Sequence, residues 1–289
     1  MPAPLLVVDA PFLLYRSFFA LPESITGIDG HPVGALLGAS NALLRVAADR
    51  DPRAIVICFG AEAAAYRVEL YPPYHASRPP VPDALAWQFE RAPELFDAFG
   101  WRCISSETLE ADDLLGSLAA AEHAAGGTTL ILTGDRDMYQ CADDRTAVLY
   151  LKSGTSGFEE IDAAEVVRRY GVAPALVPDF IALRGDPSDG LPGAPGIGAK
   201  TAAELLGRHG SLEATIAAAA GERPRVAAAL SENAELLTAF KRIAQLQQVE
   251  LERPPDAPTD LVRGAEAADR LGLGQLSRRL AAAERVTDL

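Results

Sequence analysis

The chain has 289 residues, of which 49% are hydrophobic and 23% charged, and this composition excludes a wholly disordered protein. No apolar run reaches the roughly 20 residues of a membrane span, and the first residues lack the basic stretch of a secretory signal, so we expect a cytoplasmic protein without a membrane partner. Twenty-six basic and forty acidic residues give a net charge of −14, which disfavours binding to a polyanion unless many carboxylates bind cations. The three cysteines form no CxxC pattern, which argues against a disulfide framework or a zinc site.

Short apolar runs alternate with helical patterns in the first half of the chain. Strands are predicted at 5–8, 54–59, 101–104, 129–132 and 147–151, and helices at 34–49, 83–99 and 110–125. This alternation predicts an α/β fold with a mostly parallel sheet covered by helices on both faces. In such a sheet, ligands gather beyond the carboxyl ends of the strands.

A proline-rich connection interrupts the first half of the chain, and helical patterns dominate the second half. Five prolines within 72–82 predict a stiff, exposed connection between the second strand and the helix that follows it. Further helices are expected at 162–170, 174–184, 199–207, 211–219, 232–248, 265–272 and 275–284. We therefore divide the chain into an α/β domain at 1–170 and a helical domain at 171–289.

Carboxylates cluster where the predicted elements begin or end. The four groups are Asp9; Glu110, Asp112 and Asp113; Asp135 and Asp137; and Asp186 and Asp189. Each group alone fits ordinary turn or capping chemistry. If they converge, their like charges raise one another's pKa unless cations neutralise them, and a set of oxygen ligands favours Mg²⁺ or Mn²⁺. Two such ions can promote phosphodiester hydrolysis.

A glycine-rich segment, GLPGAPGIGAKTAAELL at 190–206, is the most specific motif in the sequence. Gly193, Gly196 and Gly198 allow a tight turn, and the helix that begins at Ala199 leaves free N–H groups at its start. This pattern is typical of a helix–hairpin–helix, here at about 185–207, which holds a phosphate backbone without reading base sequence. The alternative is a plain turn between two structural helices.

With these residues in hand, the chain resembles the 5′-nuclease family, which includes flap endonucleases, phage 5′-exonucleases and the amino-terminal nuclease domain of bacterial DNA polymerase I. The likeness runs from residue 5 to about 220. It rests on five segments in the family's order and spacing, namely VVDAPFLLYRSFFALP, EADDLLG, LTGDRDMYQ, RGDPSDGLPG and PGIGAKTA. No polymerase domain follows, so we expect a stand-alone nuclease.

The resemblance implies a role for each motif. It implies that the eight carboxylates hold two or more Mg²⁺ or Mn²⁺ ions, and that the helical domain binds DNA with a 5′ flap or a 5′ single-stranded end, or an RNA primer. A helical arch at about 72–99 would let the 5′ strand pass, and family members often bind K⁺ in the hairpin. The implied DNA-binding residues are Tyr15, Arg16, Arg67, Arg78, Gly193, Gly196, Gly198, Lys200 and Thr201. The family is usually monomeric. Tyr15 could stack on a base, although an aromatic residue beside a helix is more often part of the core.

Two departures from the family pattern concern the site. Gly60 stands where the family carries an Asp at the end of the second strand, and His75 stands where a Lys is common. Loss of one ligand should weaken one ion site and shift the metal preference towards Mn²⁺. A second hypothesis is a junction-binding protein that has lost catalysis. A third, a toxin-like ribonuclease with a related acidic site, leaves the hairpin unexplained.

Overall fold

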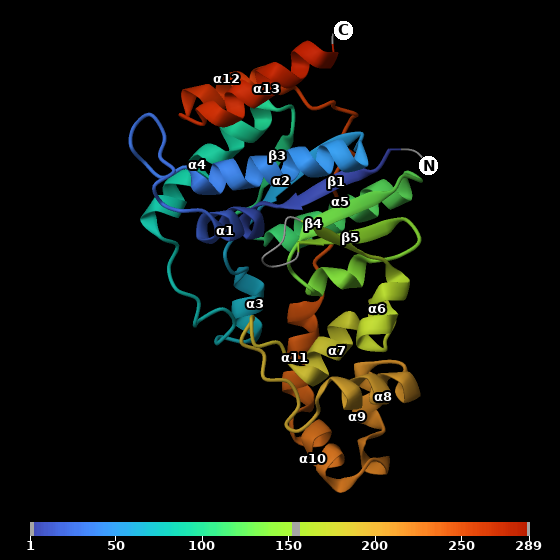
Figure 1. Cartoon of the computed structure of the whole chain (residues 1–289). Helices are drawn as coiled ribbons and strands as arrows, with labels where there is room; N and C mark the ends of the chain where they lie inside the picture. Colours follow the sequence, from blue (N-terminus) through green and yellow to red (C-terminus); the bar gives the residue numbers. More distant parts are fainter. Residues whose placement is uncertain (1–2, 152–156, 288–289) are drawn as a thin grey trace.

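A computed structural model describes residues 3–151 and 157–287 (Figure 1). Its sheet has six strands in the order β3-β2-β1-β4-β5-β6. The strands are β1 (Leu5–Asp9), β2 (Ala54–Phe59), β3 (Arg102–Ser105), β4 (Thr129–Thr133), β5 (Thr146–Leu151) and β6 (Phe158–Ile161). The first five are parallel, as predicted, and β6 pairs antiparallel with β5 at the edge. β6 was not predicted because it carries two glutamates in four residues.

Helices cover both faces of the sheet, so the expected α/β fold is confirmed. Alternate residues of β1 enter the two cores: Leu6 and Val8 on one side, Leu5 and Val7 on the other. The first core includes residues of α1 (Ala10–Ala20), α2 (Gly34–Arg50) and α4 (Asp83–Ala98). The second includes residues of α5 (Ala111–Ala124), α6 (Ala163–Tyr170) and α7 (Val177–Arg184).

Two helices of the α/β part were not predicted. The helix α1 begins directly after β1, where Asp9 accepts a hydrogen bond from the Phe12 amide and a proline occupies the first turn. The short helix α3 (Ala65–Leu70) precedes the proline-rich connection. A search for helical periodicity over a long window does not detect the capping signal that starts α1. It also does not detect a helix as short as α3.

The helical part lies at the opposite end of the molecule from the chain termini (Figure 1). It comprises α8 (Ala199–His209), α9 (Leu212–Ala217), α10 (Pro224–Glu232) and α11 (Ala234–Ala244). The helix α10 was not predicted, although Pro224 at its first position is a helix start signal. No helix within the described ranges 3–151 and 157–287 is both long enough and apolar enough to cross a membrane.

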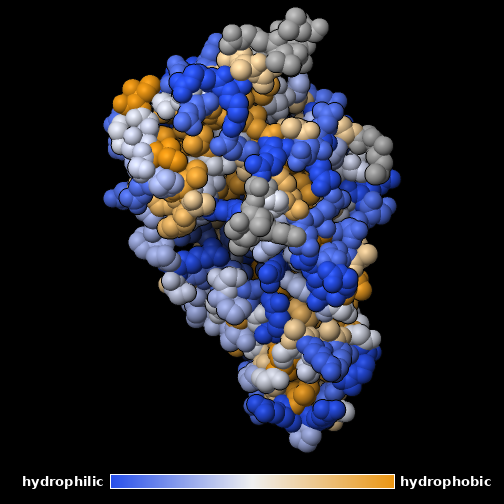
Figure 2. Space-filling model, viewed as in Figure 1, coloured by the Kyte–Doolittle hydropathy of each residue, from blue (hydrophilic) through white to orange (hydrophobic). Residues whose placement is uncertain are grey.

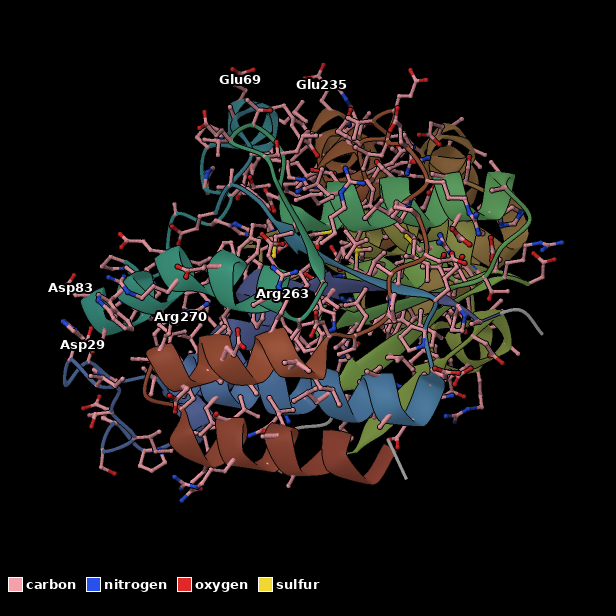
Figure 3. The ribbon with its side chains drawn as sticks, turned by 90° about the horizontal axis from the view of Figure 1, so that it is seen from above. Asp29, Glu69, Asp83, Glu235, Arg263 and Arg270 are labelled. Carbon is pink, nitrogen blue, oxygen red and sulfur yellow. The ribbon has the colours of Figure 1, made fainter. Side chains whose placement is uncertain are left out.

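The last two helices return to the α/β part, which differs from the expected helical domain at 171–289. The helices α12 (Leu261–Arg270) and α13 (Gly274–Thr287) lie beside α2 and α4 (Figure 3). The Asp260 amide donates to the Phe99 carbonyl at 2.8 Å, and the Trp101 indole donates to Thr259 at 3.0 Å. A Cβ on Gly264 would lie 2.3 Å from the Phe99 ring, so glycine allows close packing. This pair therefore belongs structurally with the sheet.

Candidate active site

The predicted carboxylates surround the carboxyl end of β1, the strand at which the connections of the sheet change direction. The strands β2 and β4 flank β1, and in open parallel sheets this position forms the ligand crevice. Asp9, the last residue of β1, is only 6% exposed. Its carboxylate accepts hydrogen bonds from the Phe12 amide at 3.0 Å and from the Thr133 hydroxyl at 2.7 Å. Burial raises the pKa of Asp9 despite these two bonds.

Asp135 and Asp137 follow β4 and enter the same crevice. The Asp135 amide donates to the Thr133 hydroxyl oxygen at 3.0 Å, and the Asp137 amide donates to the Asp135 carboxylate at 2.8 Å. Burial, and then the charge of Asp189, raises the pKa of Asp135 to about 7. Burial and Asp135 raise the pKa of Asp137 well above its ordinary value. Folding thus holds these acids close together at an electrostatic cost.

Asp112, in the first turn of α5, completes this acidic group. Burial, followed by the charges of Asp135 and Asp9, raises the pKa of Asp112 well above its ordinary value. Three segments remote in sequence therefore place carboxylates within electrostatic reach of one another. A hard divalent cation would relieve this repulsion, so the donor set fits Mg²⁺ or Mn²⁺. In Figure 2, hydrophilic residues dominate the surface between the α/β part and the helical part.

Asp186 and Asp189 reach the crevice from the loop after α7. Asp186 accepts from the Ser188 amide at 2.9 Å and pairs with Arg184 at 3.1 Å. Asp189 is 7% exposed. Its Oδ1 atom lies 3.1 Å from the His75 Nε2 atom and 3.2 Å from an Arg78 guanidinium nitrogen. The helical part of the chain therefore contributes two acids to a site built on the sheet.

The acids are spread around the crevice rather than gathered at one point. Within the described part of the chain, three ligand atoms lie within 4.8 Å of one another only at His123, Asp143 and Asp144. These three residues are exposed, and His123 pairs with Asp143 at 2.8 Å. None of the three residues belongs to the predicted site, and exposed acidic groups of this kind are common without a bound ion.

Glu110 and Asp113 are both held by buried hydrogen bonds. Glu110 accepts from the Ala64 amide at 2.8 Å and from the Tyr74 hydroxyl at 3.0 Å, and it pairs with Arg67 at 2.8 Å. Asp113 is fully buried and pairs with Arg67 at 2.9 Å. It also accepts from the amides of Gln247 at 2.8 Å and Glu110 at 3.2 Å.

Arg67 is only 3% exposed, so its side chain lies in the interior and not on the surface where a DNA contact is expected. Its guanidinium binds the two carboxylates of Glu110 and Asp113 and donates to the Ile243 carbonyl at 3.0 Å. A charged group at this depth needs such partners. Arg67 therefore links α3, the start of α5 and the end of α11. Its contact with DNA stays a prediction, and these buried partners favour a structural role instead.

The other side chains of the α/β part that are predicted to contact DNA lie nearer the surface. The Arg78 side chain is 40% exposed and contacts Asp189, so it lies at the edge of the acidic group. The ring of Tyr15, on α1, is half-buried, with centroids 5.8 Å from Phe89 and 6.4 Å from Phe19. Arg16 is also half-buried.

The glycine hairpin has the backbone that its sequence predicts. Gly193 and Gly196 have φ values of 68° and 79°, and a Cβ on Gly193 would lie 2.3 Å from the Gly185 amide nitrogen. Gly198 precedes α8, and a Cβ there would meet nothing within 4 Å. The Lys200 side chain is 91% exposed, and Thr201 is half-buried.

One basic residue at the hairpin was missed by the sequence analysis. Arg225, near the start of α10, packs over Gly196, where a Cβ would lie 3.2 Å from the Arg225 Nε atom. Its side chain is exposed. The proline that starts α10 was the signal that could have located it.

Gly60 is packed against the start of α5. A Cβ on Gly60 would lie 2.2 Å from the Ala111 amide nitrogen and 2.4 Å from the Glu110 carbonyl carbon. The backbone of α5 therefore occupies the space that an aspartate side chain would need.

Two family descriptions match consecutive parts of the chain. The 5′-3′ exonuclease N-terminal resolvase-like domain matches residues 4–171, and the 5′-3′ exonuclease C-terminal SAM fold matches residues 172–261. A 5′-3′ exonuclease of Mycobacterium tuberculosis is 37% identical, over 97% of each chain. A 5′-3′ exonuclease of Streptomyces coelicolor is 34% identical, over 95% of this chain and 98% of the relative. DNA polymerase I of Mycobacterium tuberculosis is 36% identical over 87% of this chain, which spans 28% of that protein.

Solved structures share the fold at lower identity. A T5 5′-exonuclease with bound zinc has a TM-score of 0.67 and 17% identity, covering 96% of this chain and 98% of its own. The catalytic core of Rad2 in complex with DNA substrate has a TM-score of 0.66 and 14% identity, covering 97% of this chain and 91% of its own. The architecture, the acidic crevice and the full-length relatives agree. The chain belongs to the 5′-3′ exonuclease family.

Proposed function

We propose that the protein is a structure-specific, divalent-metal-dependent 5′-nuclease that hydrolyses phosphodiester bonds where duplex DNA meets a 5′ single strand. One observation carries the proposal: Asp9, Asp112 and Asp135, from three separate segments, lie within electrostatic reach of one another at the carboxyl end of β1. Burial raises the pKa of each, and the charges of Asp135 and Asp9 raise the pKa of Asp112 further. Such a site serves primer removal and flap repair. The three cysteines are free, which supports a cytoplasmic setting.

Mg²⁺ or Mn²⁺ is the proposed cofactor, in two or more copies. The carboxylates that interact electrostatically around Asp135 and Asp137 would hold the ions; they are Asp9, Asp112, Asp135, Asp137, Asp186 and Asp189. When bound, the ions supply Lewis-acid stabilisation of the charge that develops during phosphodiester hydrolysis. Glu110 and Asp113 already accept several hydrogen bonds, so we assign them the role of fixing the start of α5 and thereby Asp112.

The surrounding residues would orient the substrate. Arg78 would neutralise a phosphate at the edge of the acidic group, and the half-buried Tyr15 ring would stack on a base near the junction. The 5′ strand would pass the arch at 72–99. The hairpin at 193–198 would hold the duplex backbone through main-chain N–H groups, with Lys200, Thr201 and a K⁺ ion. We propose that the protein acts as a monomer.

A labelled 5′-flap duplex tests this function. Wild-type protein with Mg²⁺ or Mn²⁺ should release the flap, and flaps made of DNA and of RNA show whether primers are also cleaved. Asp135→Ala and Asp112→Asn should abolish cleavage while binding of the flap survives. Cleavage at the full rate by both variants contradicts the assignment.

The closed space at Gly60 favours a second candidate, a junction-binding protein without catalysis. The same assay separates the two. Binding without products under either ion supports the second candidate, and metal-dependent products support the first.

A further inference from the structure

Two consecutive residues of the proline-rich connection are buried, although most of their neighbours are exposed. Tyr74 is 4% exposed and His75 is 8% exposed. Their rings stack with centroids 3.8 Å apart. A stiff, exposed linker would not need to bury a polar ring, so the contacts of His75 call for an explanation.

The His75 ring bridges two acceptors. Its Nδ1 atom lies 3.0 Å from the Glu62 carbonyl oxygen, and its Nε2 atom lies 3.1 Å from the Asp189 Oδ1 atom. A backbone carbonyl only accepts, so Nδ1 carries a hydrogen atom and the ring orientation is fixed. The Nε2 contact then ties the Asp189 carboxylate to this ring. The His75 amide also donates to the Asp189 carbonyl at 3.4 Å.

The backbone of His75 is strained in support of this contact. Its φ is 55°, a left-handed conformation that few residues with a Cβ adopt. The following turn is closed by a hydrogen bond from the Arg78 amide to the His75 carbonyl at 3.0 Å. Arg78 then reaches the same Asp189 oxygen at 3.2 Å. Strain of this kind persists where the surroundings fix a functional geometry.

The neighbour of His75 holds another acid of the site. The Tyr74 hydroxyl donates to Glu110 at the start of α5 at 3.0 Å, while His75 holds Asp189 in the loop after α7. This turn therefore fixes the separation between an acid of the α/β part and an acid of the helical part. We propose that His75 is a positioning residue that ties Asp189 to the base of the arch and thereby tunes metal affinity, without contacting DNA. This inference rests on the proposed function.

His75→Gly tests this role, because glycine adopts the same φ without strain and lacks only the ring. Without metal, the variant should melt below the wild type, because the buried contacts of the ring are lost, so each protein's response to metal is compared with its own metal-free melting temperature. The Mn²⁺ concentration needed for a given rise in melting temperature should increase about tenfold or more, as for other residues that orient metal ligands. The half-saturating Mn²⁺ concentration for flap cleavage should increase in parallel, with KM for DNA unchanged. His31→Gly, a loop histidine stacked on Trp87, is the matched control and should change none of these values.

Each other outcome overturns a different statement. Unchanged Mn²⁺ dependence in His75→Gly overturns the positioning role while the proposed function stands. A raised KM for DNA with unchanged Mn²⁺ dependence means that His75 contacts DNA instead. A wild type without Mn²⁺ response or cleavage overturns the proposed function and this inference with it. If His75→Gly does not fold, His75→Asn, whose side chain also tolerates this φ, is measured by the same criteria.

Discussion

A methyl group at Gly60 should disturb both the stability and the activity of the protein. Ordinary contacts of a Cβ begin at 3.4 Å, whereas a Cβ on Gly60 would lie 2.2 Å from the Ala111 nitrogen and 2.4 Å from the Glu110 carbonyl carbon. Both neighbours are backbone atoms, so the start of α5 must move by about 1 Å. Overpacking of this kind costs about 1–3 kcal/mol. For a chain of this length, that lowers the melting temperature by roughly 2–10 °C.

The same displacement moves Asp112, which lies in the first turn of α5. A misplacement of about 1 Å in a catalytic geometry can cost on the order of 100-fold in rate. We therefore expect Gly60→Ala to reduce flap cleavage by about that factor at saturating Mn²⁺. Thermal unfolding and single-turnover cleavage measure the two effects.

Gly207→Ala is the control, since it lies on an exposed helix position with nothing within 4 Å of the added atom. It should leave cleavage unchanged and raise stability by up to about 1 kcal/mol. Gly60→Asp should behave like Gly60→Ala and should not restore an ion site. Wild-type stability and cleavage in Gly60→Ala, or a gain of Mg²⁺-dependent activity in Gly60→Asp, refutes the packing argument.

Three further predictions concern residues outside the acidic group. Arg225→Ala should weaken binding of the flap duplex and lower the slope of log affinity against log salt by about 1. The control Arg263→Ala on α12 should leave both quantities unchanged. An unchanged slope in Arg225→Ala excludes a phosphate contact. Arg67→Ala leaves two buried carboxylates without their cation and should cost about 3–5 kcal/mol in urea unfolding, and a cost below about 1 kcal/mol contradicts the buried ion pairs. Burial raises the pKa of Glu122, but its two arginine partners lower it further, below 4.5. The stabilisation of the folded state by the Glu122 carboxylate is therefore present above pH 4.5 and lost as the pH falls through the lower folded-state pKa. The destabilisation by Glu122→Gln should accordingly vanish in acid. A difference in unfolding free energy that stays constant across pH contradicts this.

Much of the fold could be predicted because the local signals agree with the tertiary structure. Most of the parallel strands are apolar runs, and Gly193 and Gly196 of the hairpin have positive φ. The return of α12 and α13 to the sheet could not be predicted, because an amphipathic helix does not specify which core it covers. The helix α3 was missed because it has only six residues, and α1 was missed because it follows β1 without an intervening turn.

The candidate site was predicted less completely than the fold. The approach of Asp9, Asp112 and Asp135 could be predicted, because Asp9 and Asp135 stand at the ends of parallel strands and Asp112 stands at the start of a helix that packs on the same sheet. The burial of Arg67 does not follow, because its partner Ile243 is remote in sequence and contributes a backbone carbonyl. The packing of α5 against Gly60 is likewise a contact between backbones, which leaves no residue-type signal beyond glycine itself.

Calorimetric titration of Mn²⁺ into the metal-free protein tests the central claim most directly. At pH 6 the wild type should bind the ion and release protons, because the pKa of Asp135 is about 7 and ligands must lose their protons to bind. Asp112→Asn and Asp135→Asn should lose the binding heat and flap cleavage together while still binding the flap. Mn²⁺ binding in both variants with the affinity and proton release of the wild type would contradict the account.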